Sequence, residues 1–471
     1  MAGDSPVADA STRSPVRQAI WVVVTFVAVW LAVAAYWKTT HHLPSIRELL
    51  LSGIGVPLLL VIGIVSIRKS FNPVHRPTPK RAPQIADTAA ETPDGDPARN
   101  WTMALLDASM RLPAGMNVDE VLALARDGKV VGLHPTLRRL DGAKVFAGSA
   151  ESIWRDDFDD GMLALGAKAS GNDEQRRAML LAAETIDELM QRHATTPVAS
   201  PKDALQAEVP PFQLHLLLPE RWRADAPTLT AWLDRHLARG HWQPGVAPAK
   251  TVIVAHSIEA LEALDALNVE LNQQPSTSRH IVLACDSTLS QQTVDLLDAA
   301  GRLFAHDHPD GQIPGEGACA LLLALPTAAS ASDTAQIHRL VVAELPMSDT
   351  RTGQPNGDTV AGLLQKALAQ SSHPDLAIAD CALVSDADQR ISSRAEISDA
   401  ARQAWPADVD TRPRCHHLGI ANGDSGAVLA LSTIAAAGAH SVAARQSTLA
   451  VSIGAPTIRS ALLVSHPAPL G

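Results

Sequence analysis

Side chains able to act as nucleophiles or proton acceptors stand at two places in the chain. His256 and Ser257 follow an apolar run and precede an amphipathic one, and Cys415 stands shortly before Asp424. A nucleophile at a helix start would lie at the positive end of the helix dipole, which lowers the pKa of a thiol or hydroxyl. These four residues are the catalytic candidates. Each also has a plainer interpretation as a loop or helix-capping residue.

The neighbouring histidines do not indicate a metal site. Adjacent residues of a strand point to opposite faces, so only Cys415 and His417 of the Cys-His-His run could act together. His306, His308 and Asp310 alternate in spacing, but they occupy a Pro/Gly-rich turn without a third distant ligand. We therefore expect no metal and no cofactor.

The cysteine pattern and the charge exclude further classes. A net charge of -11 argues against a nucleic-acid partner. The cysteines lack the close pairs of a zinc site or a disulfide framework, so reduced thiols are favoured over disulfides. They are Cys285, Cys319, Cys381 and Cys415.

The elements that must position these candidates form an α/β series from residue 210 to residue 471. Predicted strands cover Phe212–Leu218, Thr251–Ala255, His280–Ala284, Ala318–Leu325, Arg339–Leu345, Ala379–Val384, Thr448–Ile453 and Arg459–Ser465. Predicted helices cover Leu229–Leu237, Ser257–Leu271, Gln291–Ala300, Asp358–Ala369, Ser393–Ala404 and Ser425–Ala437. This alternation predicts mainly parallel strands covered by helices, in two similar halves.

The region 101–209 shows a different pattern. Amphipathic stretches at Trp101–Met110, Val118–Arg126 and Glu174–Arg192 predict helices. Between them, the turn residues of GLHPTLRRLDGAKVFAG predict a small strand pair. The region either completes the first half of the α/β series or forms a separate helical cap.

Two apolar runs near the N-terminus predict a transmembrane hairpin over residues 18–70. Ile20–Trp37 is long enough to span a bilayer, and Leu49–Ile67 is a second such run. A cleaved signal peptide is the alternative, but no cleavage motif follows and a second span comes soon after. Residues 1–17 form a tail, and the Pro-rich residues 71–100 form a linker.

Basic residues orient this hairpin. They gather before the first span and after the second, at Arg13, Arg17, Arg68, Lys69, Arg76, Lys80 and Arg81. By the positive-inside rule, both termini and the soluble region should lie in the cytoplasm, at a bacterial inner membrane.

Several motifs, in order, resemble the β-ketoacyl synthases of the thiolase superfamily. The run Gln312–Leu323 is similar to the family's PGEGAxxLLL turn and strand and contains Pro314, Gly315, Glu316 and Gly317. Gly423-Asp424-Ser425-Gly426-Ala427 resembles the GHxxGAxxG helix start, and Ala284–Ser287 resembles GGVDS. The resemblance covers about residues 210–465. It implies a duplicated αβαβα fold, with Glu316, Gly423 and Gly426 in structural roles.

The residues that the family uses in catalysis are replaced. The cysteine nucleophile corresponds to His256, and the GH histidine corresponds to Asp424. The HGTGT turn falls at 384–387, where no histidine stands. An ionised aspartate cannot donate a hydrogen bond to a thioester oxygen, so condensation is not expected.

Three functions remain open. The preferred one is a membrane-tethered, non-catalytic scaffold or adaptor that binds a protein partner or pairs with itself. Degenerate proteins of this style resemble components of type VI secretion and virulence loci. The rivals are an acyl-processing enzyme that uses His256, Ser257 or Cys415, and a chain-length-factor-like partner of a ketosynthase. An acyl carrier or an acyl-CoA is the implied ligand.

Overall fold

The computed structural model describes residues 97–466 except 128–130, 152–156, 167–172, 194–210, 241, 243–244, 327–333, 346–355 and 372–375. The described residues all belong to one compact unit, Pro93–Gly471. The predicted transmembrane hairpin lies outside the described residues. So does most of the predicted linker.

An eleven-stranded mixed sheet forms the centre of the unit, in the order β11-β10-β12-β13-β8-β1-β7-β6-β4-β5, with β9 paired to β13. Its strands are β1 (Met103–Arg111), β4 (Gln213–Pro219), β5 (Lys250–Val254), β6 (His280–Ser287), β7 (Glu316–Ala324), β8 (Ala335–Ile337), β9 (Val341–Glu344), β10 (Ala382–Ser385), β11 (Cys415–His417), β12 (Thr448–Ser452) and β13 (Ile458–Ser465). A separate hairpin joins β2 (Leu133–Arg138) to β3 (Lys144–Phe146), as the turn residues predicted.

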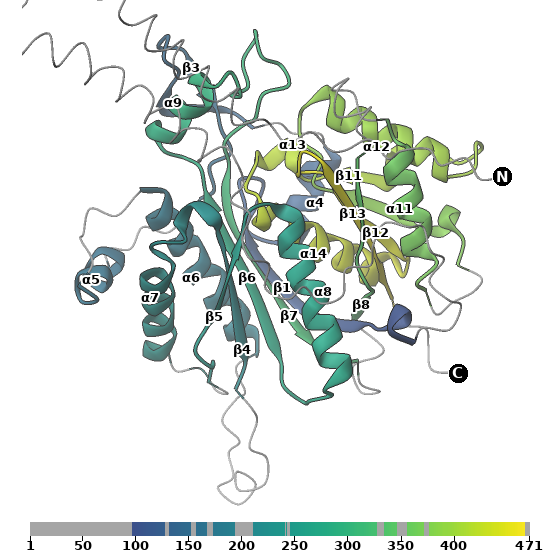
Figure 1. Cartoon of the computed structure of the whole chain (residues 1–471), viewed down its shortest axis with the longest axis horizontal. Helices are drawn as coiled ribbons and strands as arrows, with labels where there is room; N and C mark the ends of the chain where they lie inside the picture. Colours follow the sequence, from purple (N-terminus) through teal and green to yellow (C-terminus); the bar gives the residue numbers. More distant parts are fainter. Residues whose placement is uncertain are drawn as a thin grey trace, which may run out of the picture. The chain divides into compact units, whose positions relative to one another are not determined.

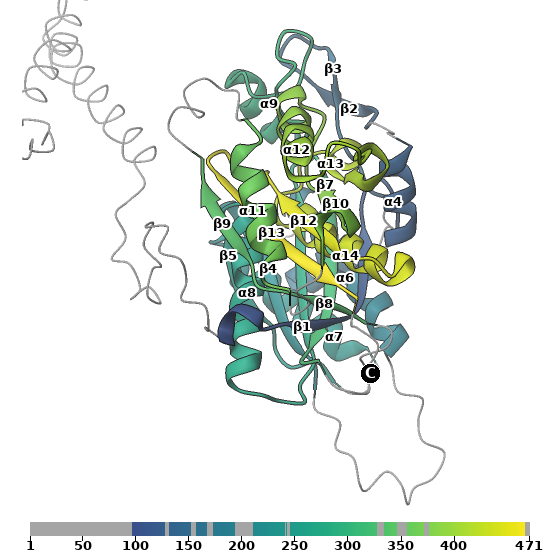
Figure 2. The same cartoon turned by 90° about the vertical axis from the view of Figure 1, so that its right-hand side faces the viewer.

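The helices form three layers, and the two halves of the sheet lie between these layers (Figures 1 and 2). They are α4 (Val118–Arg126), α5 (Asp157–Leu163), α6 (Asp173–His193), α7 (Ala226–Arg239), α8 (Ser257–Gln273), α9 (Gln291–Ala299), α11 (Asp358–Leu368), α12 (Ile391–Ala404), α13 (Gly419–Asn422) and α14 (Ala427–Ala444). One apolar core contains α8, α14 and one face of the sheet. Two outer cores contain α6 with α7 and α11 with α12. This is the predicted thiolase-like αβαβα layering, and the fold class is confirmed.

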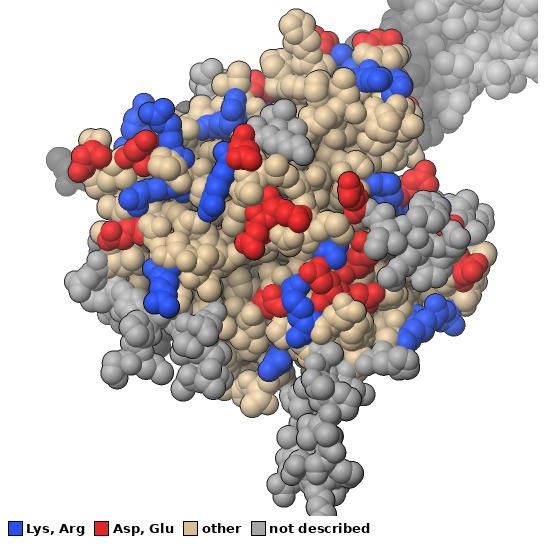
Figure 3. Space-filling model, turned by 180° about the vertical axis from the view of Figure 1, so that it is seen from behind, with Lys and Arg blue, Asp and Glu red and all other residues tan. Residues whose placement is uncertain are grey.

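Helix α14 is long and apolar enough to cross a membrane, but 72% of it is buried inside the protein. Its small residues let α8 and the strands approach closely. It is the central helix of the core. The face shown in Figure 3 carries acidic and basic side chains interspersed rather than in blocks of one sign.

The expectation of mainly parallel strands was wrong. Parallel pairing joins β4 to β5 and β6, and β10 to β11 and β12. Strand β7 is antiparallel to β6 and β1, and β13 is antiparallel to β12, β8 and β9. The link between β12 and β13 is only a short loop, which is too short for the crossover that parallel strands need.

The helix expected at Trp101–Met110 is strand β1, in the middle of the sheet between β7 and β8. Ala, Leu and Met favour helix locally, but pairing on both edges decides the outcome. Met110 packs in the core with α14, while Asp107 and Arg111 point to α6 on the other face.

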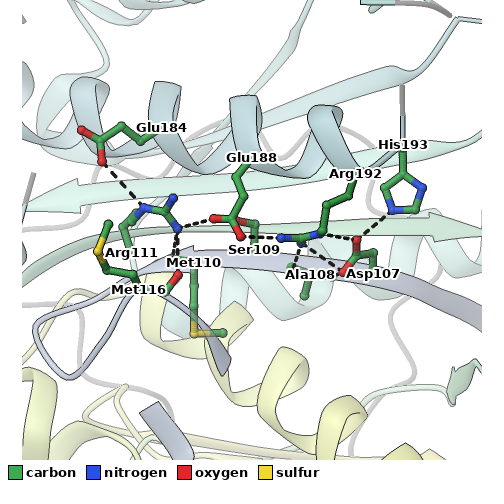
Figure 4. Close-up of polar contacts among 10 residues, drawn as sticks. All are labelled: Asp107, Ala108, Ser109, Met110, Arg111, Met116, Glu184, Glu188, Arg192 and His193. Carbon is green, nitrogen blue, oxygen red and sulfur yellow. Dashed lines mark hydrogen bonds and ion pairs between the residues drawn. The ribbon is translucent and has the colours of Figure 1, made fainter. Parts of the chain in front are cut away.

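A row of alternating charges fastens α6 to β1 (Figure 4). Arg192 donates to Asp107 at 2.8 Å, and Glu188 accepts from Arg192 and from Arg111, both at 2.5 Å. Glu188 also accepts from the Ser109 hydroxyl at 3.0 Å, so one helical turn from Glu188 to Arg192 matches the spacing of the alternate strand residues Ser109 and Asp107. Residues 101–193 therefore belong to the same body as the α/β series.

Candidate functional site

A cavity of about 310 Å³ opens where the first and second halves of the sheet meet. Its lining follows the carboxyl ends of four strands: His256 and Ser257 follow β5, Asp286 is the penultimate residue of β6, Asp386 follows β10, and Gly454 follows β12. Ligand sites of α/β folds gather at such strand ends. Asp424, in the short turn before α14, also lines this cavity.

His256 begins the first of these segments as the N-cap of α8. Its Nδ1 accepts the backbone N–H of Glu259 at 3.3 Å. The neutral ring therefore carries its proton on Nε2, which lies 3.8 Å from the Glu259 carboxylate. The ring thus caps the helix through Nδ1, faces Glu259 with Nε2, and contributes to the cavity lining.

Asp386 is held by the loop that follows β12. Its Oδ1 accepts the N–H of Ile453 at 2.7 Å, and its Oδ2 accepts the Ser452 hydroxyl at 2.5 Å and the N–H of Gly454 at 3.3 Å. Burial raises the pKa of Asp386 to about 6 in spite of these donors. The carboxylate remains ionised at neutral pH, and it is more basic than an exposed aspartate.

Asp424 stands between two glycines with positive φ, Gly423 at 69° and Gly426 at 55°. Its Oδ1 accepts the N–H of Gly426, the N-cap of α14, at 3.0 Å. Burial raises the pKa of Asp424, and the nearby carboxylate of Asp388 adds to the rise. The residue thus orders the turn before α14 and presents its other oxygen to the cavity wall.

Two arginines form ion pairs with two other carboxylates of the cavity, Asp286 and Asp388. Arg221 pairs with Asp286 and also donates to the backbone carbonyl of Ser287 at 2.7 Å. The Arg390 Nε lies 2.7 Å from the Asp388 carboxylate. Burial nevertheless raises the pKa of Asp286. The cavity is therefore polar and internally charge-paired, with Val254, Ala427 and Leu429 as its apolar side.

Glu316, in the Pro314–Gly317 turn, is fully buried outside the cavity lining. It accepts from Arg177 Nε at 2.7 Å, from the Ser287 hydroxyl at 3.1 Å and from the N–H of Ala150 at 3.0 Å. Gly315 packs against the backbone around Asn422, where a Cβ would lie 2.6 Å from the carbonyl oxygen. These are the contacts of a structural turn.

The cysteines do not form a reactive site. Cys415 shares one face of β11 with His417, but that face packs on the core of α11 and α12, away from the cavity. Burial raises the pKa of Cys415 to about 11. Cys285 lines the cavity, yet burial strongly raises its pKa also. Both thiols are therefore protonated and weak nucleophiles. Among the described residues, no group of His, Cys, Asp and Glu could hold a metal ion.

Of the residues that line the cavity, sequence reasoning named His256, Ser257 and Asp424 as catalytic candidates and Gly423 and Gly426 as structural residues. It did not single out the charged lining residues Arg221, Arg302, Asp386, Asp388 and Arg390. It also missed Ser452, which is not part of the lining but donates to Asp386. A signal was available, because the polar run Ser-Asp-Ala-Asp-Gln-Arg directly follows the apolar strand β10. Polar residues at the end of a buried strand mark a candidate site.

Comparison with solved structures places this architecture among ketosynthases. The ishigamide ketosynthase/chain length factor matches with a TM-score of 0.51 and 16% identity, over 78% of this chain and 100% of the other. The oxazolomycin ketosynthase domain of Streptomyces albus JA3453 matches with a TM-score of 0.54 and 13% identity, over 79% and 75%.

A type II polyketide ketosynthase in complex with its acyl-carrier protein matches with a TM-score of 0.52 and 12% identity, over 78% and 99%. No family model and no curated protein sequence matches the chain. At such identities the likeness shows the fold alone. It carries no argument for the expected association with secretion.

Proposed function

We propose that this chain is a ketosynthase-like subunit that does not itself condense acyl units and acts by pairing with a second subunit, as a chain length factor does with a ketosynthase. The observation that carries the proposal is the replaced constellation in the cavity. His256, Asp386 and Asp424 stand where the resemblance implies a cysteine and two histidines. A helix-capping imidazole and two carboxylates provide neither the thiolate nor the pair of hydrogen-bond donors that condensation needs.

The sheet supports the pairing because it ends in a strand with a free edge. Among the described residues, strand β5 pairs with β4 on one side only and is the last strand in its half. Lys250 and Thr251 are exposed, and Val252 and Ile253 are half-buried. An open edge with apolar residues favours the addition of another strand. This strand also leads directly into His256, so pairing here would place a partner beside the cavity.

We propose further that the apolar runs within residues 18–70 tether the subunit to the inner membrane, with the α/β unit in the cytoplasm. The length of the two runs and the basic flank of the second support this. The tether would bring the subunit and its partner to one membrane. An acyl carrier or an acyl-CoA is the ligand chemistry that fits a cavity of this fold.

The pairing can be tested with the full chain in detergent, alone and co-expressed with ketosynthases of the same bacterium, by native mass spectrometry. Thr251→Asp places a charge on the strand edge and should abolish the dimer or heterodimer. Thr251→Ala is the matched control, because both variants lose the hydrogen bond to Thr230 and only one adds charge. A wild-type chain that stays monomeric throughout, or a Thr251→Asp variant that pairs normally, would overturn the proposal.

A further inference from the structure

Three side chains form a directed chain of hydrogen bonds at the cavity wall. The Ser452 hydroxyl lies 2.5 Å from Asp386 Oδ2 and 3.2 Å from Ser257 Oγ. A hydroxyl has one proton, and an ionised carboxylate can only accept. Ser452 therefore donates to Asp386, and the proton in its contact with Ser257 comes from Ser257. The order is Ser257 to Ser452 to Asp386.

The position of Ser257 suits a nucleophile. It is the first residue of α8, a 17-residue helix, so its oxygen lies at the positive end of the helix dipole. It lines the cavity although it is only 4% exposed. The N–H groups of a first helical turn have no acceptor within the helix and can stabilise an oxyanion.

Gly454 completes the arrangement. A Cβ at this position would lie 3.0 Å from Ser257 Oγ and 3.2 Å from Asp386 Oδ2. A larger residue would therefore press on the hydroxyl and on the carboxylate together. Glycine keeps this side of Ser257 open and lets the loop N–H reach Asp386.

We propose that Ser257 is an acyl-accepting nucleophile for acyl thioesters, with its proton passed through Ser452 to Asp386. Ser257 Oγ bonds to the carbonyl carbon, the Ser257 proton moves to Ser452, and the Ser452 proton moves to Asp386. The carbon–sulfur bond breaks, the leaving sulfur takes a proton from water, and Asp386 releases its proton to water. In hydrolysis a water oxygen then bonds to the acyl-serine carbonyl carbon, and the water proton moves through Ser452 to Asp386. The carbon–oxygen bond to Ser257 breaks, Ser257 Oγ takes the proton back through Ser452, and the carboxylic acid leaves. The acyl chain lies along Val254, Ala427 and Leu429.

This activity goes beyond the proposed pairing, which requires no turnover. The chemistry is thioester hydrolysis, or transfer of the acyl group to another acceptor, rather than carbon–carbon condensation. Among the described residues, the charges of Asp388 and Arg390 interact with that of Asp386.

The test uses the full chain in detergent with hexanoyl-pantetheine, and it measures free thiol release and the intact mass after an acid quench. We expect a hexanoyl adduct on the peptide that contains Ser257. Ser257→Ala should remove the adduct and slow thiol release at least about a hundredfold. Ser452→Ala should slow acylation by about a hundredfold, because the proton path is broken.

Rescue separates this role from a purely structural one. In Ser257→Cys the nucleophile is a thiol, which depends less on a base, so adding Ser452→Ala to it should slow acylation much less than in the serine protein. An unacylated wild-type chain, an adduct on another residue, or a Ser257→Ala variant with wild-type thiol release would overturn the proposal. Ser257→Ala should still pair as the wild type does, so this result stands apart from the pairing test.

Discussion

Glu316 accepts a hydrogen bond from Arg177 Nε at 2.7 Å and so joins two segments far apart in the chain. Arg177 lies on α6, and Glu316 begins β7 directly after Pro314 and Gly315. The carboxylate is fully buried, while the guanidinium remains partly exposed. The ion pair therefore fixes the outer helix α6 to the central strand β7.

Arg177→Ala should destabilise the protein by about 3 kcal/mol, because it leaves a buried carboxylate without its cation. The hydrogen bonds from Ser287 and Ala150 would remain, so the chain should still fold. Chemical denaturation measures the loss. Arg235→Ala, at an exposed site on α7, is the control and should change the free energy of unfolding little. Equal losses in the free energy of unfolding for the two variants would show that the Arg177–Glu316 ion pair does not stabilise the protein.

Two glycines should respond to alanine in opposite directions. At Gly315 a Cβ would lie 2.6 Å from the carbonyl oxygen of Asn422. Gly315→Ala should therefore push the backbone at 315 away from that at 422 and lower the free energy of unfolding by about 1–3 kcal/mol. At Gly362, within α11, nothing lies within 4 Å of the added Cβ. Gly362→Ala should therefore stabilise the helix by up to about 1 kcal/mol. Thermal unfolding of both variants checks the signs, and a stabilising Gly315→Ala would contradict the packing described here.

Most of the α/β series from β4 to β13 could be predicted because long apolar runs and amphipathic runs alternate with clear turn residues. The three-residue strands β8 and β11 were not predicted, because they are too short to show a pattern. Helix α4 even has the predicted bounds, Val118–Arg126. Strand β1 could not be predicted, because its Ala, Leu and Met residues favour helix and only the pairing with β7 and β8 makes it a strand. Strand direction depends on connections that local patterns do not reveal.

The candidate site was predictable in part for a similar reason. His256 and Asp424 stand inside motifs, so their positions could be assigned by order along the chain. Ser452 ends an apolar strand with no motif around it, and its role arises from contacts with Ser257 and Asp386, residues far away in sequence. Such a contact follows from strand order, which the sequence does not state.

The proposed tether predicts a specific topology. In spheroplasts of the native host, a tag after Gly471 should resist added protease, while a protease site inserted between His42 and Leu43 should be cut. Deletion of residues 18–70 should move the chain from the membrane fraction to the soluble fraction. Permeabilised cells, in which both sites are cleaved, are the control. Cleavage of the C-terminal tag in intact spheroplasts would reverse the orientation.

Buried histidines should make the protein sensitive to acid, and His417 allows the effect to be isolated. Burial lowers the pKa of His417 to about 4. The His417 Nδ1 forms a 2.8 Å hydrogen bond with the Ser385 hydroxyl. The unfolded chain takes up this proton near pH 6.5, but the folded chain does so only near 4. Between these values acid therefore favours the unfolded state, by about 2 kcal/mol at pH 5 for this one group.

His417→Asn removes that titration. The variant should be less stable than the wild type at pH 7.5, because it loses a packed ring, and the deficit should shrink by about 2 kcal/mol at pH 5. Urea unfolding at the two pH values measures the change. His308→Asn, at an exposed loop position, provides the matched comparison and should show the same small effect at both. A deficit for His417→Asn that is independent of pH would mean that the folded ring is protonated in the same range as the unfolded one.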